Sequence, residues 1–167
     1  MVIWITGLSA SGKTTLSKTF EKKYKKFIPS MVLLDGDIIR ELYGGDLGFT
    51  ISDRIIQIKR LQSLSLFLEK QSILVVVAAL YSDNEILEQN RNKFQDYFQV
   101  YLKGDLSELQ KREFKGLYKA AIEGKIKNVV GVDIKWNEPV NSDLIFDICN
   151  NHSSEKMAES IYKNIIQ

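Results

Sequence analysis

The chain begins Met1-Val2-Ile3-Trp4-Ile5-Thr6-Gly7-Leu8-Ser9-Ala10-Ser11-Gly12-Lys13-Thr14, and this stretch decides the fold. The apolar, mostly β-branched run from Val2 to Ile5 predicts a buried strand. The next segment, 7–14, fits the pattern G-x-x-x-x-G-K-[ST] without a mismatch, as in phosphate-binding loops. Leu16 and Phe20 then lie four residues apart, as on one face of a helix. A strand, a glycine loop and a helix in this order predict an α/β fold with a phosphate site.

Each part of this loop has a task in binding a phosphate. Its backbone N–H groups can converge on the anion, and the helix N-terminus adds partial positive charge. Lys13 is expected to reach the β- and γ-phosphates of ATP, and the Thr14 hydroxyl to ligate Mg²⁺. The loop residues predicted to bind ATP are Gly7, Ser9, Ala10, Ser11, Gly12, Lys13, Thr14 and Thr15. The alternative is a glycine-rich turn before an ordinary helix, and the agreement of motif with context disfavours it.

Length and composition bound the class of protein. The 167 residues suit one domain with its own core, and an apolar fraction of 44% is ordinary for a globular protein. A formal net charge of +2 gives no reason to expect nucleic acid or an acidic membrane as a partner. The apolar stretch 73–80 is too short to span a membrane, and the opening strand leaves no room for a signal peptide. We therefore expect a cytoplasmic protein.

The single cysteine and the single histidine are not expected to carry chemistry. Cys149 alone excludes an intramolecular disulfide, fits a reducing compartment, and is predicted to be a small core residue. His152 has polar neighbours on its C-terminal side and is predicted to lie in a turn, not to act as a base or ligand.

Strands and helices alternate along the rest of the chain. Further strands are predicted at 31–34, 73–79, 98–102 and 144–146, and helices near 13–26, 38–42, 52–70, 84–94, 107–113, 117–123 and 153–166. Ser52 is the expected N-cap of the longest helix. The alternation predicts a mostly parallel five-stranded sheet with helices on both faces, a three-layer fold of the P-loop NTPase type. Residues 1–167 are expected to form a single domain, with a lid region at about 105–140 and an irregular segment at 124–141.

Carboxylates follow the second predicted strand. Because the carboxyl ends of parallel strands meet at one edge, Asp35 and Asp37 are expected beside the phosphate loop. A carboxylate there can hold Mg²⁺ together with Thr14, or take the proton of an attacking hydroxyl. Lys13, Asp35 and Asp37 are therefore the predicted catalytic residues. The alternative is an Asx turn in which Asp37 caps the next helix, and it could hold for one of the two.

Cations and an aromatic residue suggest a second binding region. Arg54 is predicted in the first turn of its helix, where a cation is unfavourable unless an anionic ligand binds there; a surface salt bridge is the alternative. Phe49 either stacks on a base or packs onto the helix as a staple. In the second half of the chain, the basic residues Arg112, Lys115 and Lys119 flank a glycine hinge at Gly116, as in a lid over a triphosphate.

Together these motifs resemble those of the adenylylsulfate (APS) kinases. The matching elements, in order and spacing, are Gly7 to Thr14, Leu34-Asp35-Gly36-Asp37 with Arg40, Gly48-Phe49-Thr50 with Asp53-Arg54, Ile58 with Arg60, Lys115-Gly116-Leu117-Tyr118-Lys119-Ala120, Gly131 with Asp133, Glu138-Pro139 and Asp143-Leu144. The resemblance covers nearly the whole chain and is far more specific than the phosphate loop alone. It implies transfer of the γ-phosphoryl group of ATP to the ribose 3′-hydroxyl of adenosine 5′-phosphosulfate, usually by a homodimer, as in sulfate assimilation.

The resemblance also implies roles for individual residues. Asp35 and Asp37 would serve the metal and the 3′-hydroxyl, Arg40 and Arg54 would grip the 5′ anionic arm, and Phe49 would stack on the acceptor base. The lid would contribute Arg112 to ATP, with Lys115 and Lys119 beside it. The residues expected to bind the acceptor are Asp37, Arg40, Phe49, Arg54, Gln57, Ser82, Lys115, Gly116 and Leu117.

Three departures from the family pattern fall on the acceptor side. Gln57 stands where the family has Asn, Ser82-Asp83-Asn84-Glu85 stands for Ser-Pro-Tyr-Arg, and Val129 replaces a Phe that would cover the adenine. Losing one stacking face costs roughly 1–3 kcal/mol, and Glu85 adds repulsion toward an anionic acceptor. We therefore expect a small-molecule nucleotide with a modified 5′-diphosphate-like arm. The leading candidate is cytidine diphosphoramidate, which relatives of the family phosphorylate in capsule decoration, and plain APS is the alternative.

Two other classes of protein also carry phosphate loops. A regulatory or mechanical NTPase is disfavoured by the lid motif at 115–118 and by the short chain. A nucleotide-binding module without catalysis is disfavoured because Lys13, Thr14, Asp35 and Asp37 are all present.

Overall fold

A five-stranded parallel sheet organises the structure, a computed structural model that describes residues 1–80, 83–150 and 152–166. The strands are β1 (Val2–Thr6), β2 (Met31–Asp35), β3 (Leu74–Ala79), β4 (Tyr97–Lys103) and β5 (Leu144–Asp147). Their order is β2-β3-β1-β4-β5, so β1 lies at the centre and pairs with β3 and β4. All the pairings are parallel, which confirms the predicted sheet.

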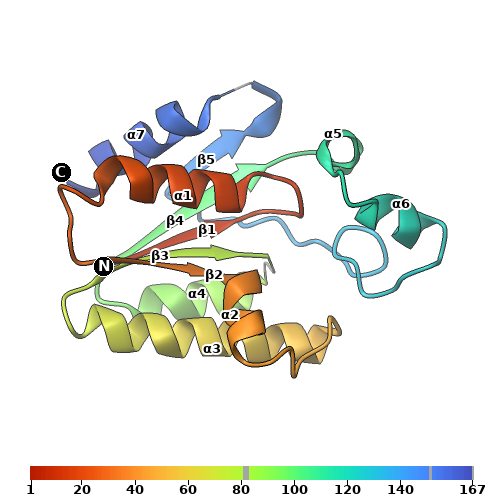
Figure 1. Cartoon of the computed structure of the whole chain (residues 1–167), viewed down its shortest axis with the longest axis horizontal. Helices are drawn as coiled ribbons and strands as arrows, with labels where there is room; N and C mark the ends of the chain where they lie inside the picture. The colour runs from red at the N-terminus through yellow and green to blue at the C-terminus, as the bar shows by residue number, and fades with distance from the viewer. Residues whose placement is uncertain (81–82, 151, 167) are drawn as a thin grey trace.

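Helices cover both faces of this sheet and complete three layers (Figure 1). The helices are α1 (Lys13–Tyr24), α2 (Gly36–Leu42), α3 (Ile51–Glu69), α4 (Asn84–Lys93), α5 (Leu106–Arg112), α6 (Leu117–Ile122) and α7 (Ser154–Ile165), with the 3₁₀ helix η1 (Ile148–Asn150) after β5. Helices α1 and α7 lie on one face, α3 and α4 lie on the other, and α5 and α6 stand beyond the carboxyl ends of the strands. The three-layer α/β fold is confirmed.

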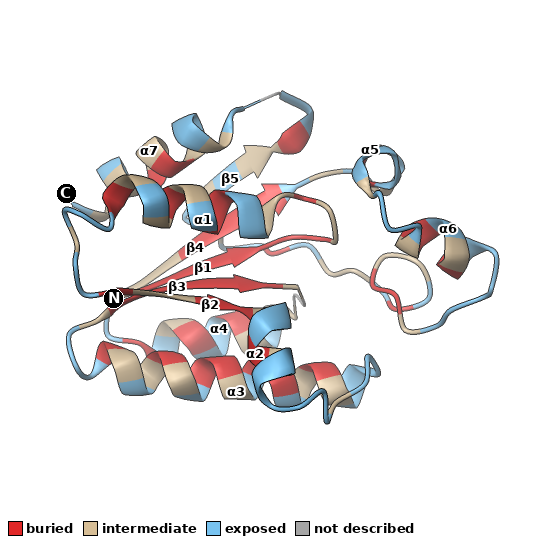
Figure 2. Cartoon of the chain, viewed as in Figure 1, coloured by how far each residue is buried: buried red, intermediate tan, exposed pale blue. Residues whose placement is uncertain are grey.

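The alternation of side chains along β1 explains how the layers hold together. Successive residues of a strand point to opposite faces. Ile3 and Ile5 pack in one buried cluster with Leu16 of α1, whereas Val2 and Trp4 pack in a second cluster on the α3 side. Every residue of β1 is buried (Figure 2), and its first four residues form a continuous apolar run, as is usual in parallel sheets covered on both faces.

One helix start differs from the prediction. Helix α3 begins at Ile51 because Thr50, not Ser52, is its N-cap. The Thr50 hydroxyl accepts a hydrogen bond from the Asp53 backbone N–H (3.2 Å), and the Asp53 carboxylate accepts one from the Thr50 backbone N–H (3.3 Å). Asp53 can complete this capping box only three residues after the cap, which selects Thr50.

Two further points concern the second half of the chain. Cys149 is exposed within η1, so the prediction of a core cysteine is wrong. The irregular segment 124–141 is confirmed, with a bridge between Val130 and Ile134 as its only described strand-like pairing. None of the helices in the described ranges is both long and apolar enough to cross a membrane.

Candidate active site

The phosphate loop occupies the turn between the end of β1 and the start of α1. Gly7 has a φ of 153°, and a Cβ there would lie 2.7 Å from the Leu102 carbonyl oxygen. Gly12 has a φ of 97° and occupies the N-cap of α1. Both positions therefore need glycine, one for a close backbone approach and one for left-handed backbone. Gly7 and Gly12 therefore allow the backbone conformation that a phosphate-binding loop requires.

Lys13 reaches back across this loop. Its Nζ donates a hydrogen bond to the Leu8 carbonyl oxygen at 2.8 Å. Burial lowers the pKa of Lys13 to about 8, and the negative charges of Asp37 and Asp35 oppose that shift. A buried ammonium with only a neutral acceptor is stabilised by an anion placed beside it. The position of Lys13 thus favours a bound phosphate.

Asp35 connects the end of β2 to the phosphate loop. The Thr14 hydroxyl donates a hydrogen bond to Asp35 Oδ2 at 2.7 Å, and the Asp37 backbone N–H donates one to Asp35 Oδ1 at 3.0 Å. Asp35 is buried and is itself the N-cap of α2. The alternative in which Asp37 caps this helix is therefore wrong. Asp37 lies in the first turn of α2 and is exposed at the same edge of the sheet.

Thr14 and Asp35 together fit a magnesium ion. Mg²⁺ is usually held by one or two protein oxygens together with substrate phosphates and water. The described residues contain no group of three or more His, Cys, Asp or Glu that could hold a metal by themselves. A hydroxyl and a carboxylate already 2.7 Å apart suit an ion that arrives with a nucleotide.

Phe49 contacts two arginines at some distance in sequence from the phosphate loop. The Arg40 guanidinium carbon is 4.8 Å from the centre of the Phe49 ring, and that of Arg54 is 5.5 Å from it. Arg40 donates to the Gly48 carbonyl oxygen at 2.6 Å, and Arg54 donates to the Phe49 carbonyl oxygen at 3.0 Å. The Phe49 side chain is nevertheless 53% exposed. The structure therefore gathers two cations and an open aromatic ring, which can bind an anionic arm and a flat base.

The two readings of Phe49 are compatible in this geometry. Phe49 precedes the N-cap Thr50, and Arg54 is the fourth residue of α3, which are the two positions of a hydrophobic staple. Here a cation–π contact takes the place of the apolar one. Arg54 is only 8% exposed, which is unusual for a charged residue in the first turn of a helix.

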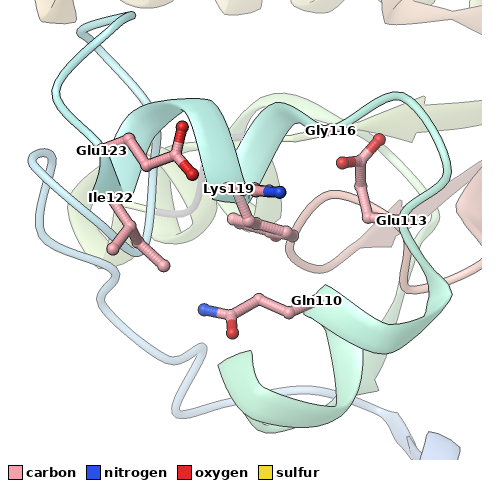
Figure 3. Close-up of a pocket in the computed structure, with 7 residues that line it drawn as sticks. Gln110, Glu113, Gly116, Lys119, Ile122 and Glu123 are labelled. Atoms are coloured by element: carbon pink, nitrogen blue, oxygen red, sulfur yellow. The ribbon is translucent and has the colours of Figure 1, made fainter.

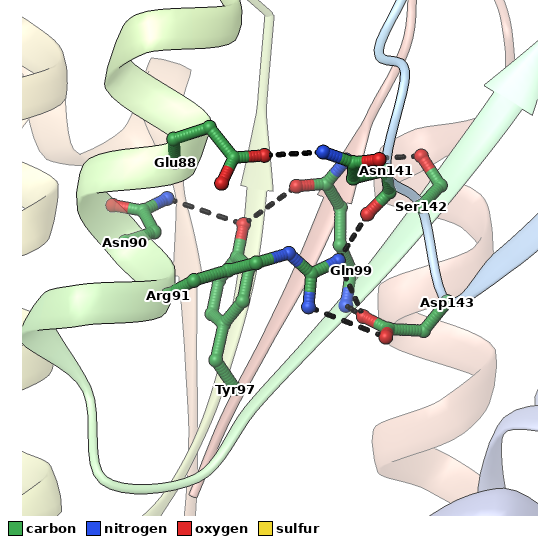
Figure 4. A network of polar contacts seen from close by, with 8 residues as sticks. All are labelled: Glu88, Asn90, Arg91, Tyr97, Gln99, Asn141, Ser142 and Asp143. Atoms are coloured by element: carbon green, nitrogen blue, oxygen red, sulfur yellow. Dashed lines mark hydrogen bonds and ion pairs between the residues drawn. The ribbon is translucent and has the colours of Figure 1, made fainter.

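Gln57 lies one helical turn below Arg54 and contacts the turn that carries the carboxylates. Its Nε2 donates a hydrogen bond to the Gly36 carbonyl oxygen at 2.9 Å. Its Oε1 is buried and has no hydrogen-bond partner among the described residues. In contrast, buried Gln99 donates to Ser142 Oγ at 2.9 Å and accepts from the Tyr97 hydroxyl at 3.0 Å (Figure 4). The acceptor atom of Gln57 is thus free for a ligand, while Gln99 is fully used in the fold.

The other residues that depart from the family pattern contribute less to the described geometry. Ser82 lies outside the described residues. Glu85 is exposed in the first turn of α4, where its backbone N–H donates to Asp83 Oδ1 at 3.0 Å. Val129 is only 5% exposed and belongs to the core, so it offers no open surface to a base.

The predicted lid is fastened to the phosphate loop by Tyr118, a residue of the lid motif to which the sequence assigned no separate role. The Tyr118 hydroxyl of α6 donates a hydrogen bond to the Ser9 carbonyl oxygen at 3.0 Å. Tyr118 is 1% exposed, and burial raises its pKa to about 12. The preceding turn is held by Glu113, whose carboxylate accepts from the backbone N–H groups of Lys115 and Leu117. Gly116, with a φ of 74°, is the N-cap of α6.

A hollow of about 220 Å³ separates α5 from α6 (Figure 3). Gln110 of α5 faces Lys119 and Ile122 of α6 across it, and Glu113 and Glu123 stand at its rim. Lys119 lines this hollow, and its role in a lid over the nucleotide stays a prediction. Contact of Lys115, Gly116 and Leu117 with an acceptor stays a prediction.

A second hollow, of about 300 Å³, lies beside the start of α1. It is lined by Ser11, Gly12, Thr15, Arg112, Ile148, His152, Ser154 and Met157. Four of these residues were predicted to bind ATP, and the structure brings them together. Arg112 is fixed there by a hydrogen bond to the Ile148 carbonyl oxygen at 2.9 Å. The apolar side chains of Ile148 and Met157, set among polar groups, suit the base and ribose of a nucleotide whose phosphates lie in the loop.

His152 was missed as a member of this hollow. It lies where η1 leads into α7, and its ring is 6.1 Å from that of Phe146. No spacing in the sequence relates it to the phosphate loop, because the two are brought together only by the packing of α7 against α1. Nothing in its geometry assigns it a proton-transfer role.

Comparison with known proteins agrees with this geometry. The family model for adenylylsulphate kinase matches residues 1–147. The chain is 36% identical over 162 residues to the cytidine diphosphoramidate kinase of Campylobacter jejuni subsp. jejuni serotype O:2, covering 97% of this chain and 95% of that protein. It is 34% identical to the adenylyl-sulfate kinase of a Picosynechococcus species, covering 86% of this chain and 81% of that one. The solved APS kinase of Mycobacterium tuberculosis with AMPPNP and APS superimposes with a TM-score of 0.90 at 30% identity, covering 99% and 97%.

Proposed function

We propose, since the chain belongs to the adenylylsulphate kinase family, that it transfers the γ-phosphoryl group of ATP to the ribose 3′-hydroxyl of a nucleotide with a modified 5′-diphosphate-like arm. The leading acceptor is cytidine diphosphoramidate, the compound in the name of the C. jejuni relative. One observation is the main support for phosphoryl transfer: the Thr14 hydroxyl of the phosphate loop and the Asp35 carboxylate are 2.7 Å apart. This contact joins the donor side of the site to the carboxylates of the acceptor side.

The two carboxylates are assigned different tasks. Asp35 is buried, and both of its oxygens already accept hydrogen bonds, so we assign it to Thr14 and Mg²⁺. Asp37 is exposed at the same edge, so we assign it to the acceptor hydroxyl, whose proton it would take as the phosphorus–oxygen bond forms. Lys13 would neutralise charge on the transferring group. Mg²⁺, when bound, would neutralise further charge on the phosphates.

The acceptor side supports an anionic nucleotide. Arg40 and Arg54 supply two positive charges next to the exposed Phe49 ring, so an acceptor with an anionic arm should bind more tightly there than a bare nucleoside. Gln57 offers a buried acceptor atom one turn away. Plain adenylylsulfate kinase activity is the second candidate, favoured by the family model and by the named relatives that act on APS. A single domain, a homodimer and a cytoplasmic location remain our predictions.

The test is an ADP-release assay with cytidine diphosphoramidate, APS and plain nucleotides as acceptors. We expect a higher kcat/KM for the cytidine compound than for APS, since specificity is the ratio of the two values. A kcat/KM of about 10⁴ M⁻¹s⁻¹ or more for APS, without turnover of the cytidine compound, would identify a plain adenylylsulfate kinase. ADP release that no acceptor accelerates would indicate an NTPase instead, and Lys13→Ala provides the inactive control.

A further inference from the structure

The segment 128–134, here called the Asp133 turn, is held in shape by one carboxylate. Asp133 Oδ2 accepts a hydrogen bond from the Asn128 backbone N–H, and Oδ1 accepts one from the Val129 N–H, both at 2.6 Å. These bonds hold the pKa of Asp133 below its usual value. Asn128 has a φ of 66° and Gly131 a φ of 93°. The carboxylate thus stabilises backbone that a non-glycine residue such as Asn128 seldom adopts.

One side of the Asp133 turn rests on the phosphate loop. A Cβ added to Gly131 would lie 3.3 Å from Cδ2 of Leu8, so the turn and the loop are in close contact there. The carbonyl oxygen of the same Leu8 accepts the hydrogen bond from Lys13 Nζ. The turn therefore borders the residues that would hold the phosphates of the donor.

The other side of the Asp133 turn holds Arg54. The Asn128 carbonyl oxygen accepts a hydrogen bond from Arg54 Nη2 at 2.8 Å, across 74 positions of sequence. Arg54 Nε is bound at the same time to the Phe49 carbonyl oxygen at 3.0 Å. The carbonyl oxygens of Phe49 and Asn128 thus fix the plane of the Arg54 guanidinium. A single hydrogen bond would leave the guanidinium free to rotate about that bond.

We propose that Asp133 is a positioning residue for acceptor binding, acting through Asn128 on Arg54. Without the carboxylate, the backbone at Asn128 relaxes from its left-handed conformation and its carbonyl oxygen turns away. Arg54 then loses one of its two described carbonyl acceptors, and with it part of what fixes its orientation toward the anionic arm. The inference rests on the proposed function for the role of Arg54, while the link from Asp133 to Arg54 stands on the hydrogen bonds alone.

The chain offers a matched control at the opposite end of the sheet. The Glu69 carboxylate also accepts from two consecutive backbone N–H groups, those of Gln95 and Asp96, both at 3.2 Å. It lies at the end of α3 that is farthest from Arg54. Glu69→Gln removes the same kind of contact as Asp133→Asn together with an ion pair to the Met1 α-ammonium (3.3 Å), so it gives an upper bound on what loss of a carboxylate-held turn does to stability.

The experiment compares Asp133→Asn with Glu69→Gln in steady-state kinetics on the better acceptor. We expect Asp133→Asn to raise the acceptor KM about tenfold or more, the effect of losing a charge-assisted hydrogen bond, with a smaller change in the KM for ATP. Glu69→Gln should lower the unfolding temperature and leave both KM values within about twofold of the parent. In an Arg54→Lys background, Asp133→Asn should no longer raise the acceptor KM. Lysine lacks the planar guanidinium whose orientation the Asn128 carbonyl oxygen fixes.

A second variant guards against a simple folding defect. Asn128→Gly accepts a positive φ at no steric cost, so adding it to Asp133→Asn should restore part of the acceptor KM. An unchanged acceptor KM in a folded Asp133→Asn protein, or an equal penalty with Arg54 and with Lys at that position, overturns the inference.

One readout is independent of the proposed acceptor. The nitrogen NMR resonances of the Arg54 guanidinium should move in Asp133→Asn and stay in place in Glu69→Gln, with no acceptor present. Resonances that stay in place in both variants overturn the inference whatever the enzyme phosphorylates. A parent enzyme that phosphorylates neither acceptor would refute the proposed function instead.

Discussion

Raising the pH from 7 to 9 should weaken ATP binding through a single group, Lys13. Burial lowers the pKa of Lys13 to about 8 in the structure. The phosphates of ATP favour the charged ammonium, so ATP binds the protonated protein and raises the pKa of Lys13. Below pH 8, Lys13 is already protonated before ATP binds, so the protein takes up no proton on binding ATP. Above pH 8 a proton must be taken up on binding, and the affinity falls as the pH rises.

The size of this effect follows from the position of the pKa. The fraction of protein with a charged Lys13 falls from nearly all at pH 7 to roughly a tenth at pH 9, so the Kd for ATP should rise about tenfold over that interval. Neither Tyr118 nor the phosphates of ATP change their charge over this range. Tyr118 has a pKa raised to about 12, and the last phosphate ionisation of a nucleotide lies near pH 6 to 7, as for phosphate monoesters at about 6.

Isothermal titration with a non-hydrolysable ATP analogue at pH 7, 8 and 9 measures this Kd directly. Lys13→Arg is the control, because a guanidinium stays charged throughout the range and should flatten the pH dependence. The same slope in the parent and in Lys13→Arg would show that another group titrates. A parent Kd that does not change with pH would mean that Lys13 keeps an ordinary pKa in the empty loop.

Four other predictions concern the remaining parts of the site. Asp35→Asn should reduce turnover by orders of magnitude while ATP affinity, measured by titration, changes little. Tyr118→Phe should raise the KM for ATP about threefold to tenfold, because Ser9 loses the hydrogen bond that fastens the lid. Gln57→Met should raise the acceptor KM, whereas Gln62→Met, at a glutamine bound to Asn90 and Lys93, should affect only the unfolding temperature. Ser82→Ala should keep substantial activity, since in-line transfer needs no covalent step; stoichiometric phosphate on Ser82, passed to the acceptor at the turnover rate, would contradict this.

The parts of the structure that followed from sequence are those fixed by neighbouring residues or by the geometry of parallel sheets. The run Val2 to Ile5, followed by two glycines and Lys13, fixes β1 and the loop through local sterics. The approach of Asp35 to Thr14 follows from a general rule, because strands in a parallel sheet end at one edge. Thr50 and Ser52 show the limit of local reasoning. Both are good N-cap residues, and only the spacing to Asp53 decides between them.

Contacts between distant segments could not be predicted in this way. Tyr118 meets Ser9 across 109 positions, and no periodicity in either segment refers to the other. Val129 is an ordinary apolar residue, and the resemblance placed it against a base, whereas packing places it in the core. Cys149 was expected in the core from the average behaviour of cysteine, but it lies on an exposed 3₁₀ turn.

The central place of β1 in the strand order has an evolutionary consequence. Elements on the β2 and β3 side supply Arg40, Phe49, Arg54 and Gln57, whereas the hollow beside α1 is completed by α5, η1 and α7 on the β4 and β5 side. Mutations in one half can therefore accumulate while selection keeps most of the other half constant, with the Asp133 turn, which contacts both Arg54 and the phosphate loop, as the exception. A lineage with this sheet can recruit a new phosphoryl acceptor by drift in α3 and the start of α4, and it inherits the use of ATP unchanged.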